Sequence, residues 1–190
     1  MDCLLFDNMT QCTSEEVALL LPMVSTQRRE QALRYTHIFG QYTCLKSFCL
    51  LVDLLRKHSL LSPDELPCFE YNTYGKPFIK NGCEFSISHC KEGIIVGIDR
   101  KPIGVDIESI RSANEALIKR TMNTQERAYI AAAQNPNIAF THLWTQKEAV
   151  VKLRGTGING DLQQVLNTEM LPHLQTIETH RYIYTIATAQ

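Results

Sequence analysis

The chain has 190 residues, 44% of them apolar, and a formal net charge of −1. This length supports one domain, or two small subdomains with a shared core, and the charge argues against a non-specific nucleic-acid binder, which usually carries a large basic excess. We expect neither a membrane protein nor an exported one, because no segment reads as long and apolar enough to span a bilayer and no basic stretch leading into an apolar one opens the sequence.

The first part of the chain is predicted to form a strand followed by helices. Residues 3–7 read as a strand. Residues 13–16 have the form of a capping box that opens a short helix, and Ser25 caps a second, basic helix that reaches about Tyr35. A longer helix is predicted over residues 41–58, because apolar residues recur there at helical spacing. These residues are Leu45, Phe48, Val52 and Leu55.

The middle of the chain reads as β structure. Residues 68–71 and 77–79 are predicted strands on either side of a turn, and Asn81 followed by Gly82 is a strong signal for a β-hairpin. Alternation of apolar and polar residues predicts a half-buried strand over residues 85–88. Two further strands are expected at residues 94–98 and 103–107.

The remainder is predicted to be helical and then β again. Residues 123–126 form another capping box, which opens a helix to about Gln134. The next helix is expected from about Ile138 to Arg154, with Gly155 as its C-terminal cap. Closing strands are predicted at residues 165–167 and 181–187.

This order of elements predicts an α+β fold built from two halves of similar length, residues 1–100 and 101–190. The seven cysteines are an odd number without the paired spacing of a zinc site or a disulfide framework. We therefore expect reduced and mostly buried thiols in a cytoplasmic protein.

Two acidic motifs in the second half carry most of the functional information. Asp106 and Glu108 lie two residues apart in a predicted strand, so they point to the same face. Trp144, Glu148 and Lys152 lie four residues apart in a predicted helix and form one ridge. Each motif alone has an ordinary explanation, either as surface charge or as core. Together, three carboxylates and a nearby lysine suit a hard divalent cation and a phosphate.

With further motifs upstream, this pattern resembles the 4'-phosphopantetheinyl transferase family. The family has a Gly-x-Asp-x-Glu strand, matched here by residues 104–108, and some forty residues later a Trp-x-x-Lys-Glu-Ala-x-x-Lys helix, matched by residues 144–152. A Gly-x-Gly loop follows at residues 155–157. The family's Gly-Lys-Pro turn and Phe-x-x-Ser-His strand end are matched by residues 75–77 and 85–89.

The length of the chain is similar to that of the longer family members, typified by the enzyme that activates surfactin synthetase. Those members fold two pseudo-symmetric α+β halves into one chain and place the active site in the cleft between them. The resemblance therefore implies a monomer. It places the coenzyme A nucleotide contacts in residues 1–100 and the metal-binding acidic motifs in residues 101–190.

The resemblance also implies a reaction and its catalytic residues. The phosphopantetheine arm of coenzyme A passes to a serine of an apo acyl or peptidyl carrier protein, and 3',5'-ADP leaves. By resemblance, Asp106, Glu108 and Glu148 hold Mg²⁺, or Mn²⁺. Glu148 is also the candidate general base, directly or through a metal-bound water. Lys152 is expected to pair with a coenzyme A phosphate and to stabilise charge on the departing diphosphate.

The resemblance assigns the nucleotide contacts to the first half of the chain. They are expected from Arg28, Lys76, Pro77, Ser88 and His89. Two departures from the family pattern put the 3'-phosphate contacts in doubt.

The first departure is Gln31, which stands where the family has a second basic residue. The second is the absence of a match for an arginine expected in the region of Gln41 and Tyr42, although Lys46 lies one turn later. The metal and pyrophosphate groups are complete.

Two other functions remain to be weighed. A non-catalytic module that binds coenzyme A or a carrier protein is the main alternative, although a binder has no need of three clustered acids. Another metal-dependent phosphotransferase lacks support, because no Walker-type glycine-rich loop is present. Carrier proteins typically present an acidic helix, so a docking surface with basic and apolar residues is expected. The candidates are residues 112–127, with Lys119 and Arg120, and the side of the predicted helix that carries Glu148. For any single residue of the first segment, a solvated helical hairpin is an equally ordinary explanation.

Overall fold

The computed structural model describes residues 1–157, 161–168 and 170–189. Its strands form two three-stranded antiparallel sheets and one small two-stranded hairpin. The first sheet has the order β1-β5-β4, from β1 (Asp2–Phe6), β4 (Glu84–Cys90) and β5 (Gly93–Asp99). The second has the order β6-β8-β7, from β6 (Ile103–Ser109), β7 (His173–Glu178) and β8 (Tyr182–Thr188). The hairpin joins β2 (Glu70–Tyr71) to β3 (Pro77–Phe78).

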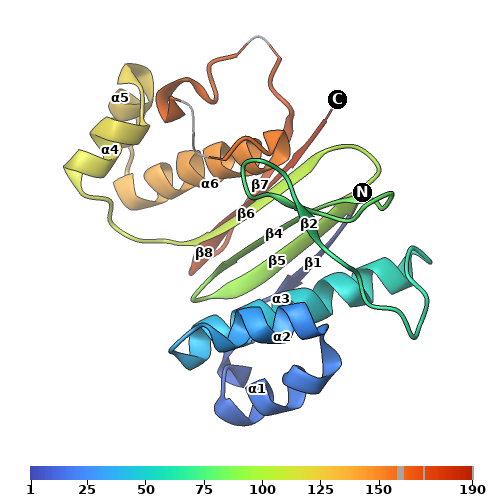
Figure 1. The fold of residues 1–190 in the computed structure, drawn as a ribbon. Coiled ribbons are helices and arrows are strands. Elements are labelled where there is room, and N and C mark those ends of the chain that lie inside the picture. The colour runs from blue at the N-terminus through green and yellow to red at the C-terminus, as the bar shows by residue number, and fades with distance from the viewer. Residues whose placement is uncertain (158–160, 169, 190) are drawn as a thin grey trace.

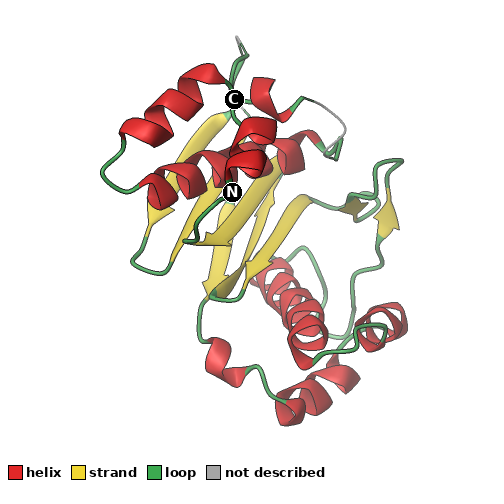
Figure 2. Ribbon diagram, turned by 90° about the vertical axis from the view of Figure 1, so that its left-hand side faces the viewer, coloured by secondary structure: helices red, strands yellow, loops and turns green. Residues whose placement is uncertain are grey.

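The helices lie on both sides of the strands (Figure 1). One group lies between β1 and β2 in the chain and consists of α1 (Ser14–Leu20), α2 (Thr26–Leu33) and α3 (Ile38–Lys57). The other group follows β6 and consists of α4 (Glu115–Thr121), α5 (Thr124–Ala132) and α6 (Pro136–Arg154). Figure 2 shows the strands between these two helical layers. Short 3-10 turns occur at Met9–Gln11, Leu21–Met23 and Leu162–Gln164.

The two sheets share one topology. In each, a first strand is followed by three helices and then by a hairpin whose last strand returns to the centre and pairs with the first strand. The mixture of helices and antiparallel strands confirms the predicted α+β class. Pseudo-symmetry in the strict sense and a domain boundary at residue 100 stay predictions.

Local capping signals in the sequence fix the helix ends. The side chains of Thr13, Ser25 and Asn123 each accept a hydrogen bond from a backbone N–H in the first turn of α1, α2 and α5. The capping box predicted at Asn123 and Glu126 is complete in both directions. Gly155 ends α6 with a left-handed φ of 67°, as predicted from its position.

Helix α3 forms the core of the first half. Among the described residues it is the helix that is long and apolar enough to cross a membrane, which corrects the expectation from sequence. It packs against α1, α2, β1 and β5, and 61% of its most apolar window is buried inside the protein. Its apolar character is therefore explained by core packing. Its fully buried side chains include Leu45, Phe48, Leu51 and Leu54.

Two predictions of β structure were wrong, and one strand was missed. Asn81 has a positive φ and Gly82 closes a turn onto Ile79, but this turn is no hairpin, because β3 pairs with β2 and β4 pairs with β5. Residues 165–167 follow a 3-10 turn and form no strand. The apolar Val165 suggested a strand, but in the structure it packs with Leu162 against α6. Strand β7 was not predicted, because it is an edge strand with a mostly polar sequence.

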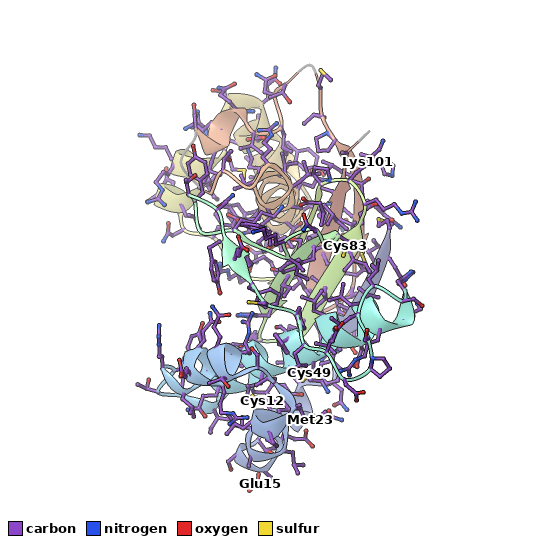
Figure 3. The ribbon with its side chains drawn as sticks, turned by 45° about the vertical axis from the view of Figure 1, so that its right-hand side comes forward. Cys12, Glu15, Met23, Cys49, Cys83 and Lys101 are labelled. Carbon is purple, nitrogen blue, oxygen red and sulfur yellow. The ribbon has the colours of Figure 1, made fainter. Side chains whose placement is uncertain are left out.

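The cysteines are free, as expected, but the expectation that most of them are buried was wrong. Figure 3 shows Cys12 in the helical layer of the first half and Cys83 nearer the strands. Cys44 is buried, Cys68 is exposed, and the other five lie between these extremes. Burial raises the pKa of the Cys3 thiol to about 11, which keeps it protonated and unreactive at neutral pH.

Candidate active site

The acidic strand and the acidic helix meet because Gly104 has no side chain. A Cβ atom at this position would collide with the carbonyl oxygen of Ala149 and lie 2.5 Å from the backbone nitrogen of Leu153. Only a glycine therefore lets α6 lie directly against β6. This close approach brings the ridge of α6 over the face of β6 that carries the acidic motif.

Strand β4 joins the site from the first sheet. It lies beside β6 and is held there by two serine hydroxyls. The backbone N–H of Val105 donates to Ser86 Oγ at 3.0 Å, and Ser88 Oγ donates to Asp106 Oδ1 at 2.8 Å. Both serines are buried. The contact between the two sheets is thus polar at the point where the predicted site lies.

Lys152 is the central cation of the site. Its Nζ lies 2.7 Å from Asp106 Oδ1 and 2.7 Å from Ser88 Oγ. Asp106 is only 2% exposed, so the carboxylate depends on these partners to offset its loss of hydration. Residues from β4, β6 and α6 therefore converge in one network, and three of the residues predicted for the site are members of it.

Glu108 is oriented by an aromatic neighbour. The indole Nε1–H of Trp144 donates to Glu108 Oε1 at 3.0 Å, and an Arg111 guanidinium nitrogen lies 3.9 Å from Oε2. The Trp144 ring is itself stacked on Phe140, with ring centroids 6.1 Å apart. The sequence placed Trp144 on the same ridge as Glu148, but its role as the partner of Glu108 follows only from the structure.

Two carboxylate oxygens of the site are buried without a hydrogen-bond partner. They are Asp106 Oδ2 and Glu148 Oε1. Burial, and then the charge of Asp106, raises the pKa of Glu148 to about 7. The same two causes raise the pKa of Glu108 above its ordinary value. Unpaired buried oxygens of this kind are costly, so the site as described carries an excess of negative charge that an oxygen-seeking cation would relieve.

The donor set suits a divalent cation, although its side chains are not gathered around one point. Within the ranges that the structure describes, no three acidic, histidine or cysteine side chains stand ready to hold one ion. The ammonium of Lys152 takes the position beside Asp106 that a cation would share. Carboxylates alone, with space for water beside them, are the ligands that Mg²⁺ accepts. Asp106, Glu108 and Glu148 therefore fit the predicted metal by chemistry and by their unpaired oxygens.

Two cavities meet at Glu148 and Lys152. The first has a volume of about 360 Å³ and contains the acidic motif; its lining is Ile87, Ser88, His89, Asp106, Glu108, Trp144, Glu148 and Lys152. The second has a volume of about 280 Å³ and extends toward the turn at residues 75–77; its lining includes Lys76, Pro77, Phe85, Val151 and Gly155. Ile87 also lines both cavities. The structure thus brings together all of the predicted site residues except Arg28.

Two of the predicted nucleotide residues flank these cavities with basic groups. His89 packs edge-on against Phe39, with ring centroids 6.1 Å apart. Although part of its ring is exposed, the surrounding protein removes water and, with the Lys152 charge, lowers the pKa of His89. Lys76 Nζ lies 3.6 Å from Glu84 Oε2. Both side chains therefore lie within reach of an anion in the shared cleft.

Arg28 lies elsewhere, in the helical layer of the first half. Its guanidinium carbon sits 5.3 Å from the ring centroid of Phe48 and 5.0 Å from that of Phe69, and one nitrogen contacts Cys44 Sγ at 3.6 Å. Its Nε is buried without a partner. Lys46, considered as a substitute phosphate contact, lies over the ring of Phe6 at 4.6 Å. Neither side chain lines the two cavities.

Sequence reasoning assigned no role to Lys147, the neighbour of Glu148. Its side chain is fully buried, pairs with Glu126 Oε1 at 2.8 Å and donates to the carbonyl oxygen of Leu162 at 2.7 Å. The other oxygen of Glu126 accepts from the backbone N–H of Asn123. Lys147 therefore ties α6 to the start of α5 and to the turn at residues 162–164. The sequence offered two hints of this pair. Glu126 belongs to a capping box, and Lys147 lies inside the motif at residues 144–152.

Comparison with known proteins agrees with this geometry. Residues 102–187 match the family model of the 4'-phosphopantetheinyl transferase superfamily. The chain is therefore similar to this superfamily over that region. It is 31% identical over 141 residues to the 4'-phosphopantetheinyl transferase gsp of Aneurinibacillus migulanus, which covers 71% of this chain and 57% of that protein. It is 29% identical over 149 residues to the 4'-phosphopantetheinyl transferase psf-1 of Bacillus pumilus, which covers 76% of this chain and 64% of that protein.

A further relative of this kind is the 4'-phosphopantetheinyl transferase Sfp of Bacillus subtilis (strain 168). The identity is 27% over 151 residues, which covers 77% of this chain and 67% of that protein. The chain therefore spans between 57% and 67% of the length of these three relatives. The matched family region contains β6 and α6 (Figure 1), the elements that carry the acidic motifs.

Proposed function

We propose that this chain transfers the 4'-phosphopantetheine arm of coenzyme A to a serine hydroxyl of an apo acyl or peptidyl carrier protein and releases 3',5'-ADP. One observation carries the proposal: Asp106 and Glu148 each have a buried oxygen without a hydrogen-bond partner, and both residues line a cleft that Lys152 also lines. Similarity to the superfamily suggests the reaction for this cleft. The atoms balance, because the serine oxygen bonds to the phosphorus that bears the arm while the bond to the bridging oxygen breaks.

The carboxylates would hold the metal and move the proton. Asp106, Glu108 and Glu148 would bind Mg²⁺, or Mn²⁺, which when bound neutralises charge on the attacked and leaving phosphate oxygens. Glu148 would accept the serine proton, directly or through a water. Trp144 holds Glu108 in one orientation through its indole N–H, which preorganises the site.

Lys152 has a different role before and after a cation arrives. In the described structure it is the counter-ion of Asp106. With a divalent cation held by Asp106, the ammonium of Lys152 would be available to pair with a phosphate oxygen. There it would stabilise the negative charge that develops on the departing 3',5'-ADP.

The nucleotide portion of coenzyme A is proposed to lie along the two cavities. Ser88 and His89 flank the phosphates, while Lys76 and Pro77 flank the nucleotide from the neighbouring turn. Arg28 reaches a phosphate only by leaving the faces of Phe48 and Phe69. We therefore place Arg28 at the periphery of the site.

The proposed partner is a carrier protein, and the proposed form is a cytoplasmic monomer. Lys119 and Arg120 lie in the last turn of α4, within the segment 112–127 proposed to face the acidic helix of the carrier. Seven free cysteines suit a reducing compartment. A net charge of −1 gives no electrostatic basis for binding nucleic acid. A purely binding function would leave the unpaired carboxylates of the cleft without a purpose.

The reaction is tested by intact-mass spectrometry of a purified apo acyl carrier protein incubated with this chain, coenzyme A and Mg²⁺. We expect a gain of about 340 Da, the mass of one phosphopantetheine arm. The gain should disappear with EDTA and with the Glu148→Ala variant. If coenzyme A binds but several carrier proteins gain no mass, the transferase assignment is wrong and the binding module replaces it.

A further inference from the structure

Asn72 makes three side-chain hydrogen bonds at the tip of the β2–β3 hairpin. Its Oδ1 accepts from the backbone N–H groups of Tyr74 and Lys76, both at 2.9 Å. Its Nδ2 donates to the carbonyl oxygen of Gly155 at 2.9 Å. One amide therefore shapes the turn that contains Lys76 and also reaches a residue 83 positions away in the chain.

The acceptor at the far end is the cap of α6. Gly155 ends the helix that carries Glu148 and Lys152, and a carbonyl at a helix C-terminus needs a partner from outside the helix. The turn also packs on this glycine, because a Cβ atom there would lie 3.0 Å from Lys76 Cδ and 3.5 Å from Asn72 Nδ2. The hairpin of the first half and the acidic helix of the second half are thus joined at one point.

This joint lies behind the wall of the candidate active site. Lys76 and Gly155 line both the 280 Å³ cavity and a neighbouring cavity of about 290 Å³. Asn72 lines only the neighbouring cavity. It acts on the cleft only through Lys76 and Gly155, so it cannot touch a molecule bound beside Glu148.

We infer that Asn72 is a positioning residue for coenzyme A, one that fixes Lys76 at a set distance from Lys152 by clamping the hairpin to the end of α6. This inference rests on the proposed function. With the clamp intact, Lys76 and Lys152 line one cavity from opposite halves of the chain, an arrangement suited to a ligand with several phosphates. Without it, the hairpin, which pairs through only two residues in each strand, has lost its side-chain link to α6.

The Asn72→Asp variant should lose the hydrogen bond to Gly155 and keep the hydrogen bonds within the turn. The carboxylate keeps an oxygen for the Tyr74 and Lys76 N–H groups, but it replaces the amide donor with an oxygen that faces the Gly155 carbonyl. We expect the KM for coenzyme A to rise about tenfold with kcat changed less than about twofold, because a contact made equally in ground and transition states is lost. Coenzyme A affinity, measured by titration calorimetry, should fall by the same factor.

Two further variants control this experiment. Thr73→Ala changes the exposed neighbour in the same turn and should leave KM unchanged. Asn72→Ser has a side chain too short to bond to the Gly155 carbonyl and adds no charge. It should reproduce the higher KM for coenzyme A. A purely structural role predicts a lower melting temperature and less active protein at an unchanged KM, and that result would overturn the inference.

Measuring coenzyme A affinity by titration calorimetry also distinguishes a failure of this inference from a failure of the proposed function. If the wild-type chain binds coenzyme A but transfers nothing, the affinities of wild type and Asn72→Asp still decide the role of Asn72. Equal affinities overturn the inference alone. If the wild type neither binds nor transfers, the proposed function fails and the inference fails with it.

Discussion

The two long helices, α3 and α6, hold the same place in the order of elements of their halves, yet they carry different side chains. Helix α3 turns buried apolar residues toward β1 and β5, and its Lys46 rests on the ring of Phe6. Helix α6 packs more closely on its own sheet, over Gly104, and presents Glu148 and Lys152 at the join of the two sheets. One arrangement of elements therefore serves packing in the first half and chemistry in the second.

Two strand glycines show a related contrast, although only Gly104 lies under a helix. Gly97 in β5 and Gly104 in β6 both lack room for a side chain. A Cβ at Gly97 would meet the ends of Ile103 and Val105 at 2.9 Å, whereas at Gly104 it would meet the backbone of α6. Side-chain ends can rotate away, but a helix backbone moves only as a whole.

The largest effect is therefore expected from Gly104→Ala. It should lower the free energy of unfolding by about 3 kcal/mol or more and abolish transfer, because α6 must leave β6 and takes Glu148 and Lys152 with it. Gly97→Ala is the matched control and should cost about 1 kcal/mol. Chemical denaturation and the carrier-protein mass assay check both. Equal losses of stability in the two variants would contradict the close helix–strand contact as the reason for this glycine.

The next effect concerns the buried pair of Lys147 and Glu126. Lys147→Met should lower the free energy of unfolding by about 3 kcal/mol, because it leaves a buried carboxylate without its partner. The double variant with Glu126→Gln should recover part of that loss, since the uncompensated charge is gone. Urea unfolding of the wild type, the two single variants and the double variant measures the coupling. Additive losses would show that the pair does not interact as the geometry indicates.

The sequence predicted most of the helices, because capping residues and apolar spacing act locally. Three helices begin where expected, after Thr13, Ser25 and Asn123, and α6 ends where expected, at Gly155. The hairpin at Asn81 failed because a turn signal gives the bend but not the sheet to which each flanking strand belongs.

The site was predictable only as far as its motifs reach. Strand alternation put Asp106 and Glu108 on one face, and helical spacing put Glu148 above Lys152. Spacing gives no information on contacts between elements distant in sequence. The bond from Trp144 to Glu108 and that from Asn72 to Gly155 join such elements, so only the tertiary structure reveals them.

The smallest expected effect is a change in Mn²⁺ affinity, and it compares Lys152 of α6 with Lys46 of α3. If Lys152 is the internal counter-ion of Asp106, Lys152→Met should tighten the binding of Mn²⁺ alone by about three- to tenfold, since a competing positive charge is removed. The same variant should lose carrier-protein transfer, because its ammonium no longer pairs with the phosphates. Lys46→Met removes a lysine that rests on an aromatic ring and should leave Mn²⁺ affinity unchanged. Electron paramagnetic resonance titration without coenzyme A reads the affinity directly. Weaker Mn²⁺ binding in Lys152→Met would mean that the lysine organises the carboxylates rather than competing with the cation.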